Sequence, residues 1–114
     1  MKFSYEIKED ICHAIYEGDR TLEDIYLFVK SFFALIDAEE IQSILLNLRI
    51  VEMLNSNGIG QIVRIHKQAM SQHKRLIFII NHYTQQVLQI VQLQHVLEFA
   101  ESPEEALQRL SSSR

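Results

Sequence analysis

Residues 44–60 read Ile44-Leu45-Leu46-Asn47-Leu48-Arg49-Ile50-Val51-Glu52-Met53-Leu54-Asn55-Ser56-Asn57-Gly58-Ile59-Gly60. The segment 44–48 is apolar at nearly every position, as in a strand that is covered on both faces of a sheet. After Gly58 the apolar residues recur at helical spacing, whereas a hairpin at Asn57-Gly58 would be followed by period-two alternation. A buried central strand therefore passes into a helix, and we expect Gly58 and Gly60 to allow a sharp turn and a close approach of the helix to its neighbours.

Upstream of this junction the pattern predicts two strands and a long helix. Residues 3–8 alternate between apolar and polar, which indicates a half-buried edge strand, and residues 11–16 form a second strand that ends in the turn at 17–20. Apolar residues then follow an i, i+3, i+4, i+7 spacing from Leu22 to Ile36, with Thr21 as the expected N-cap.

Downstream, strands and helices alternate. We expect a helix over 59–70 with Met70 on its apolar stripe, a strand over 76–80, a helix over 84–91, a strand over 96–99 and a last helix from Pro103 through Leu110. The last helix opens with the capping box Ser102-Pro103-Glu104-Glu105. This order predicts an α/β fold with a mixed, mostly parallel sheet of about five strands and about four helices. With 114 residues, we expect a single domain over 1–110 and a frayed tail over 111–114.

Composition excludes several classes of protein. An apolar fraction of 47% with 23% charged residues is typical of a folded globular chain. The longest apolar run, Leu76 to Ile80, is too short to cross a bilayer, and the first residues lack an apolar signal core, so we expect a cytoplasmic protein without membrane insertion. A net charge of -4 argues against nucleic-acid binding. The single cysteine, Cys12, excludes an intramolecular disulfide and a thiolate metal cluster, and we expect it in the core.

Enzyme signatures are incomplete. Ser56 stands in half of a nucleophile elbow, but Leu54 occupies the position of the first glycine, and the acids that follow Ser56 begin only at Glu98, after the last histidine. The glycines at 58 and 60 lack the third glycine of a dinucleotide loop. His66 and His73 would lie two turns apart on one helix, roughly 10 Å from each other, which is too far to share a metal ion.

The chain as a whole resembles a STAS domain of the bacterial anti-sigma factor antagonist type. The family pattern is a strand, an Asp-Ser-Ser/Thr-Gly-Leu-Gly turn, a helix, a strand and a closing helix entered through Glu-Ala-Leu. The matching segments here are 44–51, 55–60, His66-Lys67-Gln68-Ala69, 75–78, 93–99 and Glu104-Glu105-Ala106-Leu107. The departures are Asn55 for the aspartate, Asn57 for the second Ser or Thr, and His73 or Lys74 and Gln92 where the family often has glycine.

The resemblance implies a partner-switching regulator without catalysis of its own or a cofactor. In the family, the first serine of the turn is phosphorylated by a partner kinase that doubles as an anti-sigma factor, and that serine matches Ser56. A phosphatase is the other expected partner. The turn residues Asn55, Asn57, Gly58, Ile59 and Gly60 become candidates for partner binding, together with Arg64 and Lys67 farther along the helix.

Other interpretations remain open at this point. Ser56 is equally suited to a purely structural role as the helix N-cap, and Arg64 and Lys67 to a solvated helix face. The same fold could instead serve as a STAS subunit bound to the ATPase of a membrane transporter, such as a lipid-trafficking ABC complex. A small enzyme of unrecognised type is the second alternative.

Overall fold

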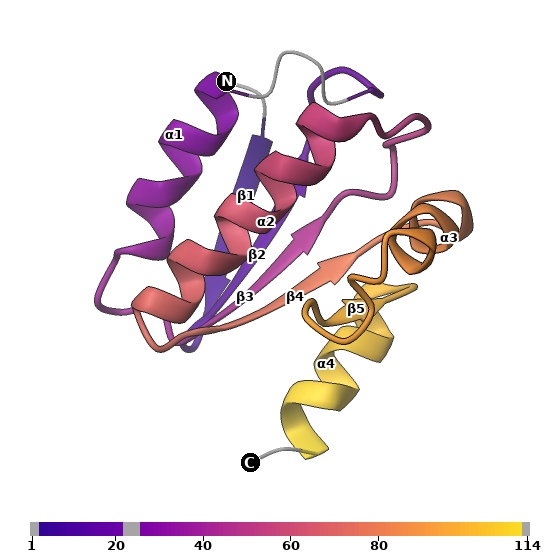
Figure 1. Ribbon diagram of the computed structural model, residues 1–114. Coiled ribbons are helices and arrows are strands. Elements are labelled where there is room, and N and C mark those ends of the chain that lie inside the picture. The colour runs from indigo at the N-terminus through magenta and orange to yellow at the C-terminus, as the bar shows by residue number, and fades with distance from the viewer. Residues whose placement is uncertain (1–2, 22–25, 113–114) are drawn as a thin grey trace.

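The computed structural model, which describes residues 3–21 and 26–112, contains one five-stranded sheet in the order β1-β2-β3-β4-β5 (Figure 1). The elements along the chain are β1 (Phe3–Lys8), β2 (Ile11–Tyr16), α1 (Tyr26–Ile36), β3 (Ser43–Asn47), α2 (Ser56–Ser71), β4 (Arg75–Ile79), α3 (His82–Ile90), β5 (Phe99–Ala100) and α4 (Pro103–Ser112). β1 and β2 are antiparallel, whereas all the other neighbouring strands are parallel. The predicted α/β class, with a mixed, mostly parallel sheet and four helices, is confirmed.

The helices cover the two faces of the sheet unequally. α1 and α2 lie side by side across one face, and α4 packs on the other (Figure 1). Because strands β2, β3 and β4 follow one another in the sheet, right-handed connections place the helices between them on the same face. α4 contacts β3, β4 and β5, and on the same face of the sheet Glu6 and Lys8 of β1 and Ile15 of β2 are exposed, whereas Ile11 of β2 packs against the cluster beneath α4.

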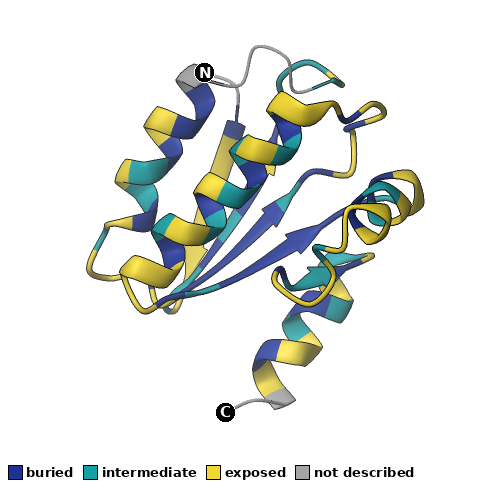
Figure 2. Cartoon of the chain, in the orientation of Figure 1, coloured by how far each residue is buried: buried dark blue, intermediate teal, exposed yellow. Residues whose placement is uncertain are grey.

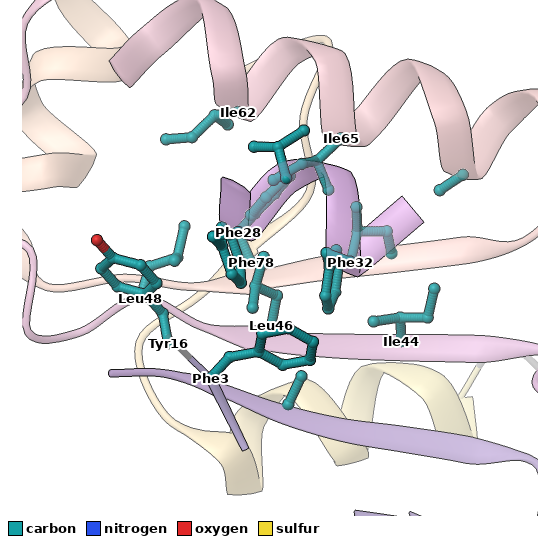
Figure 3. Close-up of a cluster of buried hydrophobic side chains, with 14 of the residues drawn as sticks. Phe3, Tyr16, Phe28, Phe32, Ile44, Leu46, Leu48, Ile62, Ile65 and Phe78 are labelled. Carbon is teal, nitrogen blue, oxygen red and sulfur yellow. The ribbon is translucent and has the colours of Figure 1, made fainter. Parts of the chain in front are cut away.

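Residues of β3 are buried on both faces, as the apolar run predicted. Ile44 and Leu46 pack with Phe28, Phe32 and the other side chains beneath α1 and α2 (Figure 3), while Leu45 packs with α4. The same alternation holds in β4, and the strands in the middle of the sheet are the most completely buried elements of the chain (Figure 2). Two apolar layers therefore hold the sheet from both sides.

The edge strand differs from its expected pattern. Phe3 is buried at 6% exposure, but Tyr5 and Ile7 on the same face remain 51% and 37% exposed. The reason is that α1 and α2 cover the sheet from β2 onward and leave most of β1 uncovered. The predicted edge position of β1 is confirmed, but only its first residue is buried, so the strand is not half-buried along its length.

Several predicted boundaries move by a few residues. The long helix begins at Tyr26 among the described residues, whereas Leu22 to Ile25 lie outside them, so the Thr21 cap is not tested. α3 begins at His82, two residues before its predicted start, because Asn81 is its cap. The last strand lies at Phe99–Ala100 and not at 96–99, since only these residues pair with β4. The Ser102 cap is confirmed, because the Glu105 amide donates to the Ser102 hydroxyl at 3.2 Å. The return bond of the capping box is displaced by one residue, since the Glu105 carboxylate accepts from the Glu101 amide at 2.9 Å.

Two helices end on left-handed residues that are not glycine. His73, which follows α2, has a φ of 58°, and Gln92, which follows α3, has a φ of 62°. Both occupy the position just past a helix end where glycine is usual, because a side chain is disfavoured in that conformation. The departures from the family pattern at His73 and Gln92 therefore fall on the residue just after each helix C-cap, Gln72 and Val91.

Candidate functional site

The carboxyl ends of the parallel strands meet at one edge of the sheet, where Ser56 is found. β3 ends at Asn47, the connection runs through residues 48–54, and α2 begins at Ser56. In open α/β sheets, ligands bind outside the carboxyl ends of the strands. The sequence predicted this placement of the serine between a buried strand and a helix.

Asn55, and not Ser56, is the N-cap of α2. The Oδ1 atom of Asn55 accepts a hydrogen bond from the Gly58 amide at 2.9 Å, and the backbone of Asn55 is extended, with φ −98° and ψ −179°. Ser56 is the first helical residue, and its side chain is exposed. The structural alternative in which Ser56 caps the helix is therefore wrong. Because asparagine and aspartate cap helices about equally well, Asn55 keeps the capping role that the family's aspartate can fill.

The glycines of the turn do not have the conformation expected of them. Gly58 and Gly60 both lie inside α2, and none of the glycines has a positive φ. Gly58 is buried, whereas a Cβ added at Gly60 would meet nothing within 4 Å. The expectation of a sharp turn that requires glycine is wrong, and Gly60 faces open space and not a packed neighbour.

The loop that leads to Ser56 is tied to both neighbouring strands. On one side, the backbone oxygen of Arg20 accepts from the amides of Glu52 and Met53, at 2.7 and 3.2 Å, and the Arg20 and Glu52 side chains form an ion pair. On the other side, the Nδ2 atom of Asn81 donates to the backbone oxygens of Arg49, at 2.8 Å, and Val51. These contacts fix the backbone that presents Ser56.

Apolar side chains are exposed beside the serine. Met53 is 63% exposed and Tyr83, at the start of α3, is 43% exposed, and both line a shallow depression of about 130 Å³ together with Asn55. Methionine and aromatic residues are enriched in protein–protein interfaces. We call Met53, Asn55, Ser56, Asn57 and Tyr83 the switch surface. Met53 and Tyr83 could not be assigned to this surface from the sequence, because only the tertiary structure brings the first turn of α3 beside the turn at 55–57.

Arg64 and Lys67 are exposed but lie away from the switch surface. They follow Ser56 by eight and eleven residues, which places them roughly 12 and 16 Å farther along the helix axis. The Arg64 guanidinium stands over the ring of Phe33 in α1, 5.6 Å from its centroid, and also donates to Gln61. The structure therefore does not bring these two cations together with the serine.

Cys12, His66 and His73 are the side chains that the sequence offered for thiol or metal chemistry. Cys12 is completely buried, and burial raises the pKa of its thiol to about 11, so it is a core residue as expected. His66 lies in α2, where partial burial lowers its pKa, but His73 lies beyond the end of the helix, so the expectation that they share one helix is wrong. The described residues contain no cluster of three or more histidine, cysteine or acidic side chains that could hold a metal ion. Within the same residues, no helix combines the length and apolar character that a bilayer span requires.

Solved structures with a similar architecture include anti-sigma factor antagonists. TM1081 from Thermotoga maritima, assigned as such an antagonist, is 25% identical with a TM-score of 0.81, and the match covers 94% of this chain and 92% of that one. The antagonist from Mycobacterium paratuberculosis is 13% identical with a TM-score of 0.75, over 94% of this chain and 91% of that one. SpoIIAA in its unphosphorylated form is 17% identical with a TM-score of 0.72, over 96% of each chain.

Sequence comparison agrees with the structure. A search among curated proteins finds no match. The model of the STAS domain family, however, matches residues 4–106, which span all five strands and the start of α4. This chain therefore belongs to the STAS domain family.

Proposed function

We propose that this domain is a partner-switching regulator that binds a protein through the switch surface, and that phosphorylation of Ser56 weakens this binding. The observation that supports the proposal most directly is the position of Ser56: an exposed hydroxyl on the first helical residue, flanked by exposed Met53 and Tyr83. The partners we propose are a serine kinase that acts as an anti-sigma factor and a phosphatase that restores the unmodified state. The domain itself would carry no catalysis.

Phosphorylation would change the charge of this surface sharply. Residues 53–57 carry no charge, and the nearest acid before them, Glu52, is paired with Arg20. A phosphate on Ser56 adds about −1.5 to −2 charges at pH 7. Arg64 lies roughly 12 Å along the axis, which exceeds a Debye length of about 8 Å at physiological salt, so it neutralises little of that charge. The surface would pass from neutral and partly apolar to strongly anionic.

The fold should tolerate the negative charge of a phosphate on Ser56 without a change of structure. An anion at a helix N-terminus is favourable, because the first amides of the helix and the macrodipole present positive potential. A partner packed over Met53 and Tyr83 would instead have to desolvate the new dianion, at a cost of a few kcal/mol. The proposed switch thus acts through the surface and not through refolding.

The test combines partner identification with charge variants of Ser56. Tagged protein is isolated from its native cell, and co-purifying proteins and the phosphorylation of Ser56 are read by mass spectrometry. Binding of the identified partner is then titrated against the wild type, Ser56→Ala, Ser56→Asp and a control, Gln42→Glu. Gln42 is exposed just before β3, at the opposite end of the sheet, and the control adds the same single negative charge.

We expect Ser56→Asp to weaken binding by about tenfold or more, while Ser56→Ala and Gln42→Glu bind as the wild type does. Unfolding free energies should stay within about 1 kcal/mol of the wild type, because the helix terminus accepts the added charge. Equal binding by Ser56→Asp and the wild type would refute the switch. Recovery of a transporter ATPase with unmodified Ser56 would replace it with the transporter-subunit role.

Gly60→Ala and Tyr83→Ala map the contact. A methyl group at Gly60 meets nothing in the free domain and should raise its stability by about 0.5–1 kcal/mol, since glycine is unfavourable inside a helix. Weaker partner binding by this more stable variant would place α2 at the interface. Loss of binding in Tyr83→Ala, by about 1 kcal/mol or more, would identify the aromatic ring as an anchor.

A further inference from the structure

The two edges of the sheet differ in length and protection. β5 contributes only two residues, whereas β1 runs for six residues and pairs with β2 along its whole length without a bulge. The other side of β1 has no neighbouring strand among the described residues. Edge strands of this length are usually protected by charged side chains, proline, a bulge or a covering segment, because their free amides and carbonyls accept a further strand. Of these, β1 has only charged side chains, Glu6 and Lys8.

An apolar groove runs beside this edge. Tyr5 and Ile7 are 51% and 37% exposed and, with Ala34, Leu35 and Ala38 at α1 and its end, line a groove of about 340 Å³. The Tyr5 ring stacks on Phe3, with 6.1 Å between centroids, and so extends the aromatic core outward to the strand edge. The edge therefore has an apolar side.

The opposite side of β1 carries complementary charges. Glu6 and Lys8 share this side, and their charged atoms lie 3.9 Å apart in the free domain. Residues that lie directly opposite each other in an antiparallel ladder point to the same face of the sheet. β1 can therefore pair with a copy of itself only in registers that place the apolar sides of both strands on one face and their polar sides on the other. In the register centred on Ile7, Glu6 of each copy lies opposite Lys8 of the other. In the register centred on Glu6, two like charges would oppose each other.

We propose that two copies of this chain associate through β1, antiparallel, across a twofold axis at Ile7. Ile7 meets Ile7 of the second copy on the apolar side, two Glu6–Lys8 pairs form on the polar side, and the two sheets become one. The occupant is a second copy because the charge pattern of β1 is complementary to itself. The ladder is short, so the dimer is weak and forms with rising concentration. No residue of the switch surface takes part.

The test is sedimentation velocity of the purified chain over a concentration series into the high micromolar range. Glu6→Lys and Lys8→Glu each convert two attractive pairs into two repulsive ones, and the dissociation constant should rise about tenfold or more. The double variant Glu6→Lys/Lys8→Glu restores complementarity and should recover the wild-type constant. Ile7→Lys places two cations on the axis and should leave only monomer.

Two control variants separate the effects of the β1 substitutions on dimerisation from the effects of any change in surface charge or surface apolarity. Ile90→Lys removes a surface isoleucine that is 79% exposed in α3. Glu104→Lys makes the same change of net charge as Glu6→Lys, at an exposed position in the first turn of α4. Both should dimerise as the wild type does. A wild-type chain that stays monomeric throughout would overturn the proposal. So would a dimer that survives Ile7→Lys, or a double variant that fails to recover association while its circular dichroism spectrum is unchanged.

Discussion

Replacing Asn81 by aspartate tests how the loop before Ser56 is held. The Oδ1 atom of Asn81 accepts from the Thr84 amide at 2.9 Å and caps α3, while its Nδ2 atom donates to the backbone oxygens of Arg49 and Val51. Aspartate is nearly the same size and can still accept the capping bond. It cannot donate, so both backbone oxygens lose their bond to this side chain and face a negative carboxylate.

The expected cost follows from these contacts. Two hydrogen bonds are lost at roughly 0.5–1.5 kcal/mol each, and the repulsion between carboxylate and carbonyl oxygens adds to this. The Val51 oxygen keeps a long bond from the Thr84 hydroxyl at 3.4 Å, and the Arg49 contact is exposed to water, which limits the loss. We therefore expect Asn81→Asp to lower the unfolding free energy by about 2 kcal/mol.

Asn55→Asp is the matched control. Asn55 caps α2 in the same way, through the Gly58 amide at 2.9 Å, but within the described part of the chain no donated bond ties its side chain to another strand connection. Aspartate should cap equally well and gain from the helix dipole, so stability should stay within about 0.5 kcal/mol of the wild type or rise. Comparing the same substitution at the two caps thus separates the effect on stability of the accepted capping bond, which both variants keep, from that of the donated bonds, which only Asn81 makes.

Urea unfolding and thermal unfolding, both followed by circular dichroism, measure the unfolding free energy and the melting temperature of both variants. At neutral pH we expect a melting temperature roughly 8 °C lower for Asn81→Asp and little change for Asn55→Asp. Below about pH 4 the introduced carboxyl becomes protonated and can donate one bond, so the deficit of Asn81→Asp should shrink as the pH falls. Equal stability of the two variants at neutral pH would refute the proposed role of the Asn81 amide.

Two further predictions concern the helix ends and the core. His73→Gly and Gln92→Gly should each raise the unfolding free energy by about 0.5–1 kcal/mol, measured as a higher urea midpoint, because glycine adopts a left-handed conformation without strain. A lower midpoint in both would show that the native side chains contribute more than the backbone strain costs. Cys12 should resist iodoacetamide at neutral pH in the native protein and react rapidly in urea, because burial raises its pKa to about 11. Intact mass spectrometry measures the modified fraction, and equal rates in the two conditions would contradict a closed core.

The candidate site was only partly accessible to sequence reasoning. The position of the serine between a buried strand and a helix was predictable, since the apolar run of the strand, the helical spacing of apolar residues after it and the turn residues between them are local signals. Its neighbours were not: Met53 and Tyr83 are thirty residues apart and meet only because consecutive parallel strands end at one edge. The supporting Asn81 lacked any signal beyond its suitability as a cap, because its donated bonds reach across to another connection.

The sequence by itself determined the order and type of the elements, the STAS resemblance and the burial of the central strands. These follow from periodicity, capping residues and a motif of adjacent positions, all of which act over a few residues. Only the tertiary structure decided which apolar faces remain uncovered and which side chains share a surface. Ile7 and Leu46 are both apolar strand residues, yet Ile7 is 37% exposed and Leu46 is completely buried, because the helices extend over β3 and leave most of β1 uncovered. Whether a strand residue is buried depends on where the helices pack on the sheet, and the residues that decide this packing are distributed over the whole chain.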